Sequence, residues 1–375
     1  MLSKKIVFLT GTRADFGKIK SLIQILKDDA SFEVHLFVTG MHLQEKYGYT
    51  VIEIVKSGFE NIHRFNNETS AYTMDLTMAK TIEGFSPLVQ SLQPDLIVIH
   101  GDRVEALAGA TVGALNNILV AHIEGGEKSG TIDELIRHAV SKLSHIHLVS
   151  NEAAKTRLIQ MGELESSIYT IGSPDVDVMF SKNLPSLEEA KSNYNIVFEE
   201  YCIGMFHPVT TEKDNMAYYA KEFVDAILKQ QQENFIFIYP NNDMGNEAIF
   251  KEYERFKNAT NVVIFPSLRF EYFLALLKSA KLMIGNSSAG VREAPYYGIP
   301  TINVGSRQLD RVSAASVINC GNSKKEITKA FDKVSTVKVP PLKEFGEGKS
   351  AQLFSELLKD EKIWQINHQK QFKDI

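Results

Sequence analysis

The sequence predicts an α/β protein built from two doubly wound parallel sheets, on three observations. Short apolar runs alternate with helical patterns almost throughout the chain, as they do when helices join buried parallel strands. This alternation is interrupted between about residues 173 and 198 and then starts again. Finally, 375 residues exceed what one hydrophobic core usually serves, so we expect two domains.

The first half of the chain contains five runs that we expect to be buried strands. Each run is short, contains β-branched residues and is bounded by polar or glycine residues. These runs are Ile6–Leu9, Val34–Val38, Leu96–Ile99, Ile118–Ala121 and Ile146–Val149. Helical periodicity between them predicts helices over 15–28, 78–92 and 103–115.

The second half repeats the pattern. Its expected strands are Cys202–Phe206, Phe235–Ile238, Val262–Phe265, Leu282–Ile284 and Thr301–Val304. The stretch 173–198 is rich in Ser, Pro, Asn and charge, which is typical of a linker. We therefore predict a first domain over 1–172, a linker over 173–198, a second domain over 199–350, and a C-terminal helix over 351–375 that packs on the first domain. This helix contains Trp364 and Phe372. The expected architecture is two Rossmann-like domains that face each other across a cleft.

Composition and charge exclude several classes of protein. The net charge is −5 without a long run of one sign, so a general nucleic-acid-binding surface is not expected. No apolar run reaches the ~18 residues of a membrane span. Cys202 and Cys320 form neither a CxxC pair nor a zinc pattern, so we expect buried thiols and no metal site. Two cysteines in so long a chain, and an N-terminus without a secretory signal, predict a cytoplasmic protein.

Polar motifs follow the predicted strands, and ligands bind at the carboxyl ends of parallel strands. The first motif is the turn that begins at Gly11 and contains Arg13. It is neither a Walker A loop nor a dinucleotide fingerprint, but backbone N–H groups and the Arg13 guanidinium can hold an anion. An ordinary strand-to-helix turn with a solvated Arg13 fits the same residues.

Three acids follow later strands of the first half. Asp102 lies beside Arg103 in a tight turn, and Glu124 precedes two glycines that let the backbone approach a ligand. Asp133 lies in the first turn of a predicted helix. Acids with separated pKa values suit the removal and return of a proton. Taken singly, Asp102 also fits a helix cap, and Asp133 fits a favourable interaction with the helix dipole.

The second half has its own polar residues after strands. Pro208 stops a strand and leaves His207 at its tip, where imidazole can act as acid, base or phosphate donor. The helix expected after Gly285 begins with small residues and hydroxyls, which suit a diphosphate at a helix N-terminus. The candidates from this half are His207, Asn241, Asn286, Ser287, Ser288, Glu293 and Arg307.

Together these motifs resemble the hydrolysing UDP-N-acetylglucosamine 2-epimerases, a family that shares the two-domain fold of B-type glycosyltransferases. The resemblance runs from residue 5 to about residue 310. It is carried by the motifs GTRADF, HGDR, HIEGGEKSGTIDELIRH, HPVTTE, YPNND, GNSSAGVREA and GSRQ.

The resemblance implies a role for each candidate residue. The positions that match the family's catalytic residues are Asp102, Glu124, Asp133 and His207. The residues implied to bind the UDP-sugar are Arg13, Arg103, Asn241, Phe273, Asn286, Ser287, Ser288, Glu293 and Arg307. Within this set, Arg13 and the two serines would hold the diphosphate, and Glu293 would bind the ribose. Arg307 would lie in the same nucleotide site. Phe273 would stack on uracil, although its spacing also fits a helix core.

The implied reaction needs neither a metal nor a redox cofactor. A base removes the C2 proton of the sugar while the C1–O bond to UDP breaks, which gives a 2-acetamidoglycal. Water then adds at C1 and a proton returns to C2 from the opposite face, so the products are N-acetylmannosamine and UDP. Which acid removes the C2 proton stays open. One assignment places Glu124 and Asp133 on the glycal, with Asp102 and His207 nearer the elimination.

Four alternatives stay open. The same reaction on UDP-2,4-diacetamido-2,4,6-trideoxyglucose would lead towards legionaminic-type rather than sialic acids. A non-hydrolysing epimerase reads closer to HxEAGLRT where this chain has HIEGGEK. A B-type glycosyltransferase would need an acceptor, and the cluster of acids argues against it. A non-catalytic UDP-sugar-binding protein would be expected to lack those acids.

The family tends towards dimers or tetramers, so a homo-oligomer is expected.

Overall fold

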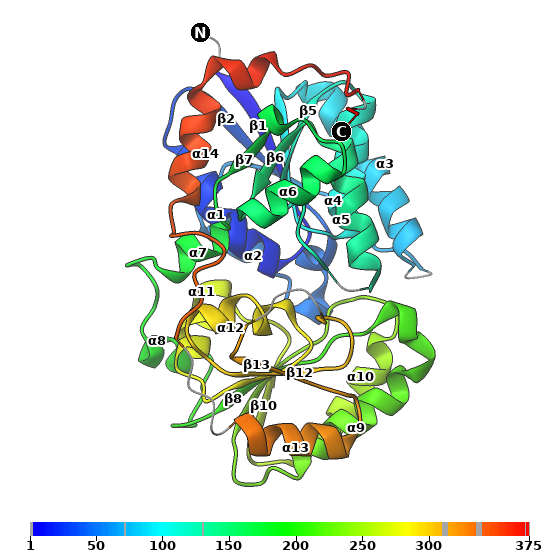
Figure 1. Cartoon of the computed structure of the whole chain (residues 1–375), viewed down its shortest axis with the longest axis vertical. Helices are drawn as coiled ribbons and strands as arrows, with labels where there is room; N and C mark the ends of the chain where they lie inside the picture. Colours follow the sequence, from blue (N-terminus) through cyan, green and yellow to red (C-terminus); the bar gives the residue numbers. More distant parts are fainter. Residues whose placement is uncertain are drawn as a thin grey trace. The chain divides into compact units, whose positions relative to one another are not determined.

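The computed structural model describes residues 3–70, 73–129, 131–309, 314–334, 340–371 and 373–374, and Phe372 of the expected C-terminal helix lies outside them. The chain divides into two compact units (Figure 1). The first unit comprises residues 1–127, 133–181 and 344–375, and the second comprises residues 128–132 and 182–343. Each unit contains one parallel sheet, so the predicted α/β class with two Rossmann-like domains is confirmed.

The sheet of the first unit has the strand order β3-β2-β1-β4-β5-β6-β7, with parallel pairing throughout the described strands. Its strands are β1 (Lys4–Thr10), β2 (Phe32–Val38), β3 (Asn61–Arg64), β4 (Leu96–His100), β5 (Leu119–Ile123), β6 (Ile146–Val149) and β7 (Ile168–Thr170). The strand order reverses between β1 and β4. A ligand crevice is expected beyond the carboxyl ends of the strands at such a reversal.

The interior strands form where the sequence predicts them. The central residues of β1, from Ile6 to Leu9, are at most 3% exposed, because strands of a doubly wound sheet are covered on both faces. The sequence does not predict β3 and β7. Both are short edge strands, and β3 has Ile62 as its apolar residue among polar ones, so neither shows the continuous apolar run of a central strand.

The helices predicted over 15–28, 78–92 and 103–115 are confirmed as α1, α3 and α4. The α-helices of this unit are α1 (Arg13–Lys27), α2 (Val51–Lys56), α3 (Met74–Leu92), α4 (Val104–Leu115), α5 (Thr131–Leu143), α6 (Glu152–Gln160), α7 (Pro174–Met179) and α14 (Ser350–Lys359). Short 3-10 turns are η1 (Gly40–Leu43), η2 (Glu45–Tyr47), η3 (Glu165–Ser167) and η7 (Glu361–Gln365). The first two residues of α5 are grouped with the second unit. α1 begins with a capping box, in which Thr12 and Asp15 each bind the other's backbone N–H.

α14 lies beside α1 and α7 in the first unit (Figure 1). Phe354 of α14 is fully buried, and its ring centroid lies 6.2 Å from that of Phe8 on β1. The N-terminal end of α14 is held by Asp177 of α7, whose carboxylate accepts hydrogen bonds from the backbone N–H groups of Ser350 and Ala351. The C-terminal part of the chain therefore contributes directly to the core of the first unit.

The second unit repeats the topology with the strand order β10-β9-β8-β11-β12-β13, which reverses between β8 and β11. Its strands are β8 (Cys202–Met205), β9 (Phe235–Ile238), β10 (Val262–Phe265), β11 (Met283–Gly285), β12 (Thr301–Val304) and β13 (Val317–Cys320). Its helices are α8 (Leu187–Asn193), α9 (Met216–Leu228), α10 (Asn246–Tyr253), α11 (Phe270–Lys278), α12 (Glu293–Tyr296) and α13 (Lys324–Val334), with 3-10 turns η4 (Thr210–Asn215), η5 (Glu254–Asn258) and η6 (Ser288–Gly290). β13 is another edge strand that the sequence does not predict.

The stretch 173–198, expected to be a linker, contains structure from both units. α7 belongs to the first unit and α8 to the second, and the chain crosses between Ser181 and Lys182. Across the described part of the chain, no helix combines the length and the apolar character needed to cross a bilayer.

Candidate active site

Two turns that follow central strands of the first unit bring candidate acids together. After β4 the chain turns at Gly101, which has a φ of +75°; apart from its two chain neighbours, no described residue has an atom within 4 Å of the place where a Cβ would lie. After β5 it turns at Glu124, which has a φ of +64° although it is not glycine. The left-handed conformation costs a residue with a side chain roughly 1–2 kcal/mol. The backbone conformation of Glu124 is therefore imposed by the structure around it.

Arg137 on α5 joins these two turns. Its side chain is 1% exposed, its Nη1 donates to the main-chain oxygen of Glu124 at 2.6 Å, and its Nη2 donates to the carboxylate of Asp102. Asp133 lies one helical turn before Arg137, and residues four apart share a face of a helix. The structure thus links Asp102 to the Glu124 turn through Arg137, which was not among the sequence candidates. The available signal was the i,i+4 spacing of Asp133 and Arg137 in TIDELIRH.

The carboxylate of Glu124 is buried and hydrogen-bonded. Glu124 is 3% exposed, and its Oε1 accepts a hydrogen bond of 2.6 Å from the hydroxyl of Ser173. Its Oε2 lies 3.4 Å from Nε2 of His100, at the end of β4. Burial with directed partners of this kind fixes the orientation of the carboxylate.

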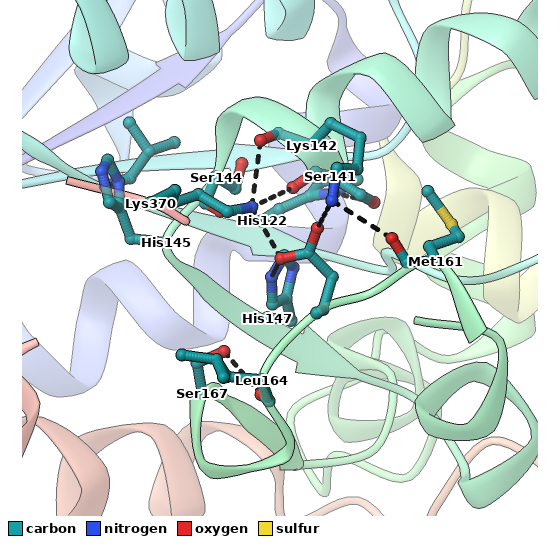
Figure 2. Close-up of polar contacts among 12 residues, drawn as sticks. His122, Ser141, Lys142, Ser144, His145, His147, Met161, Leu164, Ser167 and Lys370 are labelled. Atoms are coloured by element: carbon teal, nitrogen blue, oxygen red, sulfur yellow. Dashed lines mark hydrogen bonds and ion pairs between the residues drawn. The ribbon is translucent and has the colours of Figure 1, made fainter. Parts of the chain in front are cut away.

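His122 fixes the turn at Gly101 from inside the sheet. Its Nε2 lies 2.8 Å from the Gly101 oxygen, and its Nδ1 lies 3.1 Å from the hydroxyl of Ser141 on α5. Burial lowers the pKa of His122 to about 3, so the ring is neutral at physiological pH. A neutral ring that donates from Nε2 to the Gly101 oxygen accepts at Nδ1 from Ser141. His122 thereby ties β5, the Asp102 turn and α5 together, and Figure 2 shows it beside Ser141.

The carbonyl end of α5 is held by a cluster of charged residues around Glu163, and Figure 2 shows Lys142, His147 and Lys370 of this cluster. The Glu163 carboxylate accepts hydrogen bonds from Lys142 Nζ and Lys370 Nζ, each at 2.6 Å, and lies 2.8 Å from Nε2 of His147. Burial alone would raise the pKa of Glu163, but these partners lower it to about 2. His147 is therefore a buried structural histidine within the apolar strand β6.

Arg13 is paired rather than solvated. Its Nε donates to Glu53 Oε2 at 2.8 Å and its Nη2 forms an ion pair with the same carboxylate. The turn before it is tightened by Asp15, which accepts a hydrogen bond of 2.9 Å from the Gly11 backbone N–H. Arg103 likewise has a carboxylate partner, Glu105, at 3.2 Å. A phosphate at either cation would have to share it with a carboxylate.

In the second unit, His207, Asn241 and Asn286 form one hydrogen-bonded group at the reversal of strand order. The His207 backbone N–H donates to Asn286 Oδ1 at 2.6 Å, and Asn286 Nδ2 donates back to the His207 oxygen at 2.9 Å. The Asn241 backbone N–H donates to His207 Nδ1 at 3.0 Å. His207 therefore carries its ring proton on Nε2 when neutral. The loop after β11 thus holds the main chain of His207, and the loop after β9 binds one nitrogen of its ring.

Other nucleotide-site candidates surround Asn286. Arg307 Nη1 and Gln308 Nε2 each donate to the Asn286 oxygen at 3.2 Å. The side chain of Ser287 accepts from the Ala289 backbone N–H at 3.3 Å and so begins the 3-10 turn η6, which includes Ser288. Gly285 has a φ of +133°, and a Cβ there would lie 1.9 Å from the Met205 oxygen, so only glycine allows this approach of β11 to β8.

The expected helix after Gly285 is divided. The structure has the 3-10 turn η6 followed by the single-turn α12, in place of one continuous helix. Pro295 lies within α12 and has no N–H group to donate to a preceding carbonyl. Glu293 of α12 is 2% exposed. Phe273 is 6% exposed and stacks on Phe270 within α11, at a centroid distance of 6.4 Å, which is the core position that its spacing also allowed.

Comparisons with known proteins match nearly the whole chain. The family model described as UDP-N-acetylglucosamine 2-epimerase matches residues 24–359. A UDP-N-acetylglucosamine 2-epimerase of Neisseria meningitidis serogroup B is 48% identical over 376 residues, which cover 99% of each chain. A UDP-N,N'-diacetylbacillosamine 2-epimerase (hydrolyzing) of Legionella pneumophila is 34% identical and covers 95% of this chain and 96% of its own.

A solved structure supports the fold. The UDP-GlcNAc 2-epimerase of Methanocaldococcus jannaschii superposes with a TM-score of 0.81 at 23% identity, covering 94% of this chain and 99% of that one. The family resemblance carried by the sequence motifs is confirmed by the family model and by the relatives. The chain therefore belongs to the UDP-N-acetylglucosamine 2-epimerase family.

Proposed function

We propose that this chain is a hydrolysing UDP-N-acetylglucosamine 2-epimerase, which converts UDP-N-acetylglucosamine and water into N-acetylmannosamine and UDP. The observation that carries the proposal is the joining of Asp102 to the Glu124 turn by Arg137, at the carboxyl ends of central strands. The relatives at 48% and 34% identity, one of them named as hydrolysing, support the same class of reaction.

The chemistry balances without a redox partner. In the first step a carboxylate takes the C2 proton, the electron pair of the C2–H bond forms the C1=C2 bond, and UDP leaves with the C1–O electron pair. In the second step the oxygen of water bonds to C1 and one of its O–H bonds breaks as a base takes the proton, while C2 receives a proton on the opposite face. The sum is one UDP-sugar and one water converted into one epimerised free sugar and UDP.

We assign the proton transfers at C2 to Glu124 and Asp133. Proton transfer requires a carboxylate whose position is fixed within hydrogen-bond reach of the reacting carbon's proton. Glu124 meets the first condition, because its carboxylate is held by Ser173. Asp133 is partly exposed in the first turn of α5, on the helix that holds the Glu124 turn through Arg137. We place Asp102 and His207 at the elimination of UDP.

We assign UDP binding to the second unit. The groups that would bind the diphosphate are backbone N–H groups and hydroxyls at η6, with the guanidinium of Arg307 beside the main chain of Asn286. Donors directed at the diphosphate stabilise the charge that develops as UDP leaves. Ser287, Ser288 and Asn286 are the residues of this unit that we expect to act in this way.

The first experiment is proton NMR of the enzyme with UDP-N-acetylglucosamine in deuterated water. Free N-acetylmannosamine with deuterium at C2, together with UDP, is the expected result. UDP-N-acetylmannosamine as the product would replace the proposal with a non-hydrolysing epimerase. If only UDP-2,4-diacetamido-2,4,6-trideoxyglucose is hydrolysed, the substrate assignment is wrong and the reaction type stands, as the 34% identical relative suggests.

A pair of variants on α5 tests the role of Asp133. Asp133→Asn is expected to reduce kcat by at least a hundredfold while the Kd for UDP changes less than threefold, because the amide cannot accept a proton. Glu134→Gln is the matched control, since Glu134 is the next residue on the same helix and pairs with His138 at 3.0 Å. An equal loss in both variants, or loss of UDP binding in Asp133→Asn, would make Asp133 a structural residue.

The proposal extends to a cytoplasmic homo-oligomer. Cys202 and Cys320 are both free thiols, which fits a reducing compartment. The family resemblance favours a dimer or tetramer, and light scattering coupled to size exclusion measures it. A monomer at micromolar concentration would contradict this part of the proposal.

A further inference from the structure

Ser173 lies where the chain turns from β7 into α7, at the N-cap position of α7. A serine at this position usually accepts a hydrogen bond from a backbone N–H of the first helical turn. In α7, whose residues are all described, the Ser173 side chain makes no such capping bond. Its hydroxyl donates instead to Oε1 of Glu124 at 2.6 Å, across 49 residues of sequence.

The main chain around Ser173 is fixed on both sides. The Ser173 backbone N–H donates to the Phe345 oxygen at 2.7 Å, and its oxygen accepts from the Val176 backbone N–H at 3.0 Å. Gly172 has a φ of +80°, and a Cβ on Gly346 would lie 2.9 Å from its Cα, so these two segments touch through glycine backbones. Ser173 is itself 0% exposed. The position of its hydroxyl is therefore set by contacts that do not involve Glu124.

Glu124 needs such a partner. Glu124 is 3% exposed, so its carboxylate is held away from solvent. Its backbone has a left-handed conformation that a residue with a side chain adopts only where the surroundings impose it. On its other side, His100 Nε2 lies 3.4 Å from Oε2, which is longer than the Ser173 contact. A hydrogen bond from a neutral donor to a carboxylate is about twice as strong as one between neutral groups.

We propose that Ser173 is a positioning residue for Glu124: its hydroxyl, placed by the backbone of the β7–α7 turn, holds the Glu124 carboxylate in the orientation that proton transfer requires. This inference rests on the proposed function, in which Glu124 acts on the sugar. Ser173 acts through Glu124 and needs no contact with the substrate.

Ser173→Ala tests the inference through kinetic constants. We expect kcat for UDP-N-acetylglucosamine hydrolysis to fall between tenfold and a hundredfold, while KM and the Kd for UDP change less than threefold, because substrate binding does not use this hydroxyl. Ser144→Ala is the matched control. Ser144 is equally buried in the same unit, and its hydroxyl donates to the Val140 oxygen at 2.8 Å. Its kcat should stay within twofold of the wild type.

A double-mutant cycle with Glu124→Gln separates positioning from packing. If Ser173 acts through the Glu124 carboxylate, adding Ser173→Ala to Glu124→Gln should lower the residual rate less than twofold. A further loss of tenfold or more in the double variant would overturn the inference, as would a wild-type kcat in Ser173→Ala or an equal loss in Ser144→Ala. Failure of the wild type to release a free sugar from either UDP-sugar would instead refute the proposed function.

Discussion

Replacing Lys370 with methionine is expected to destabilise the first unit, because the ammonium group of Lys370 closes the carbonyl end of α5. Its Nζ donates to Glu163 Oε2 at 2.6 Å and to the oxygens of Ser144, Lys142 and Ser141 at 2.7, 3.0 and 3.3 Å (Figure 2). The last carbonyls of a helix have no partners within the helix and attract positive charge. Methionine keeps most of the apolar stem and removes the charge, so the variant isolates these polar contacts.

The size of the destabilisation depends on the partners that Glu163 retains in the variant. Removing one partner of a buried ion pair costs about 3–5 kcal/mol when the remaining charge is left alone. Glu163, with its side chain 2% exposed, still has Lys142 and His147, so we reduce the expected loss in the free energy of unfolding to about 2–3 kcal/mol. Lys359→Met is the matched control. Lys359 pairs with Asp29 at 2.8 Å, but its side chain is 55% exposed, so its loss should cost less than about 1 kcal/mol.

The assay is urea unfolding followed by tryptophan fluorescence. Trp364 is the one tryptophan of the sequence and lies in η7 of the first unit, where Lys4 Nζ is 4.9 Å from its ring centroid. Its signal therefore reports the unit that contains Lys370. A loss below 1 kcal/mol in Lys370→Met, or one no larger than in Lys359→Met, would refute the reasoning and show that the cluster around Glu163 contributes little.

Two further predictions concern stability. Burial lowers the pKa values of His42 and His122 to about 3, whereas unfolded imidazoles titrate near 6.5, so the unfolded state binds more protons as the pH falls. Together the two histidines should lower the free energy of unfolding by about 4 kcal/mol between pH 7.5 and pH 5, as measured by urea unfolding. A free energy of unfolding that does not change over this pH range would contradict the prediction. Gly126→Ala should destabilise by at least about 2 kcal/mol more than Gly101→Ala, measured the same way. Both glycines have φ near +75°, but of the two only Gly126 would bring a Cβ against the main chain, 2.3 Å from the Ala154 oxygen. Equal losses of stability in the two variants would show that this clash does not contribute.

The central elements of both sheets could be predicted because burial on both faces leaves a local mark. A run such as Ile6–Leu9 is apolar without interruption, short and rich in β-branched residues, which favours a strand covered on both faces. The edge strand β10 also has a continuous apolar run, but the other edge strands, β3, β7 and β13, do not. β3 and β13 pair along one side only, and each of their residues is partly buried or exposed. The missed strands are therefore the edge strands without such a run.

The candidate site was predictable to the extent that strand ends locate it. Asp102 and Glu124 follow neighbouring parallel strands, β4 and β5, and the structure connects them through Arg137. The partner of Arg13 was not predictable, because Glu53 lies 40 residues further along the chain and no local pattern links them. The same holds for Ser173 and Glu124. Sequence motifs identify which residues lie at the end of a strand. Their hydrogen-bond partners depend on which distant segments of the chain pack against the same edge of the sheet.

Thr12 and Ser173 show how a tertiary contact overrides a local rule. Both are hydroxyl residues at a helix N-cap with extended backbone, and capping statistics assign both side chains to the following helix. Thr12 does cap α1, through the Asp15 backbone N–H at 3.1 Å. Ser173 turns its hydroxyl away from α7, since a buried carboxylate within 2.6 Å offers a charge-assisted bond that is stronger than a neutral cap. α7 can lose the cap because Pro174 presets the backbone of its first turn. At the start of α7, the buried charge of Glu124 therefore takes the hydroxyl that the local rule assigns to the cap.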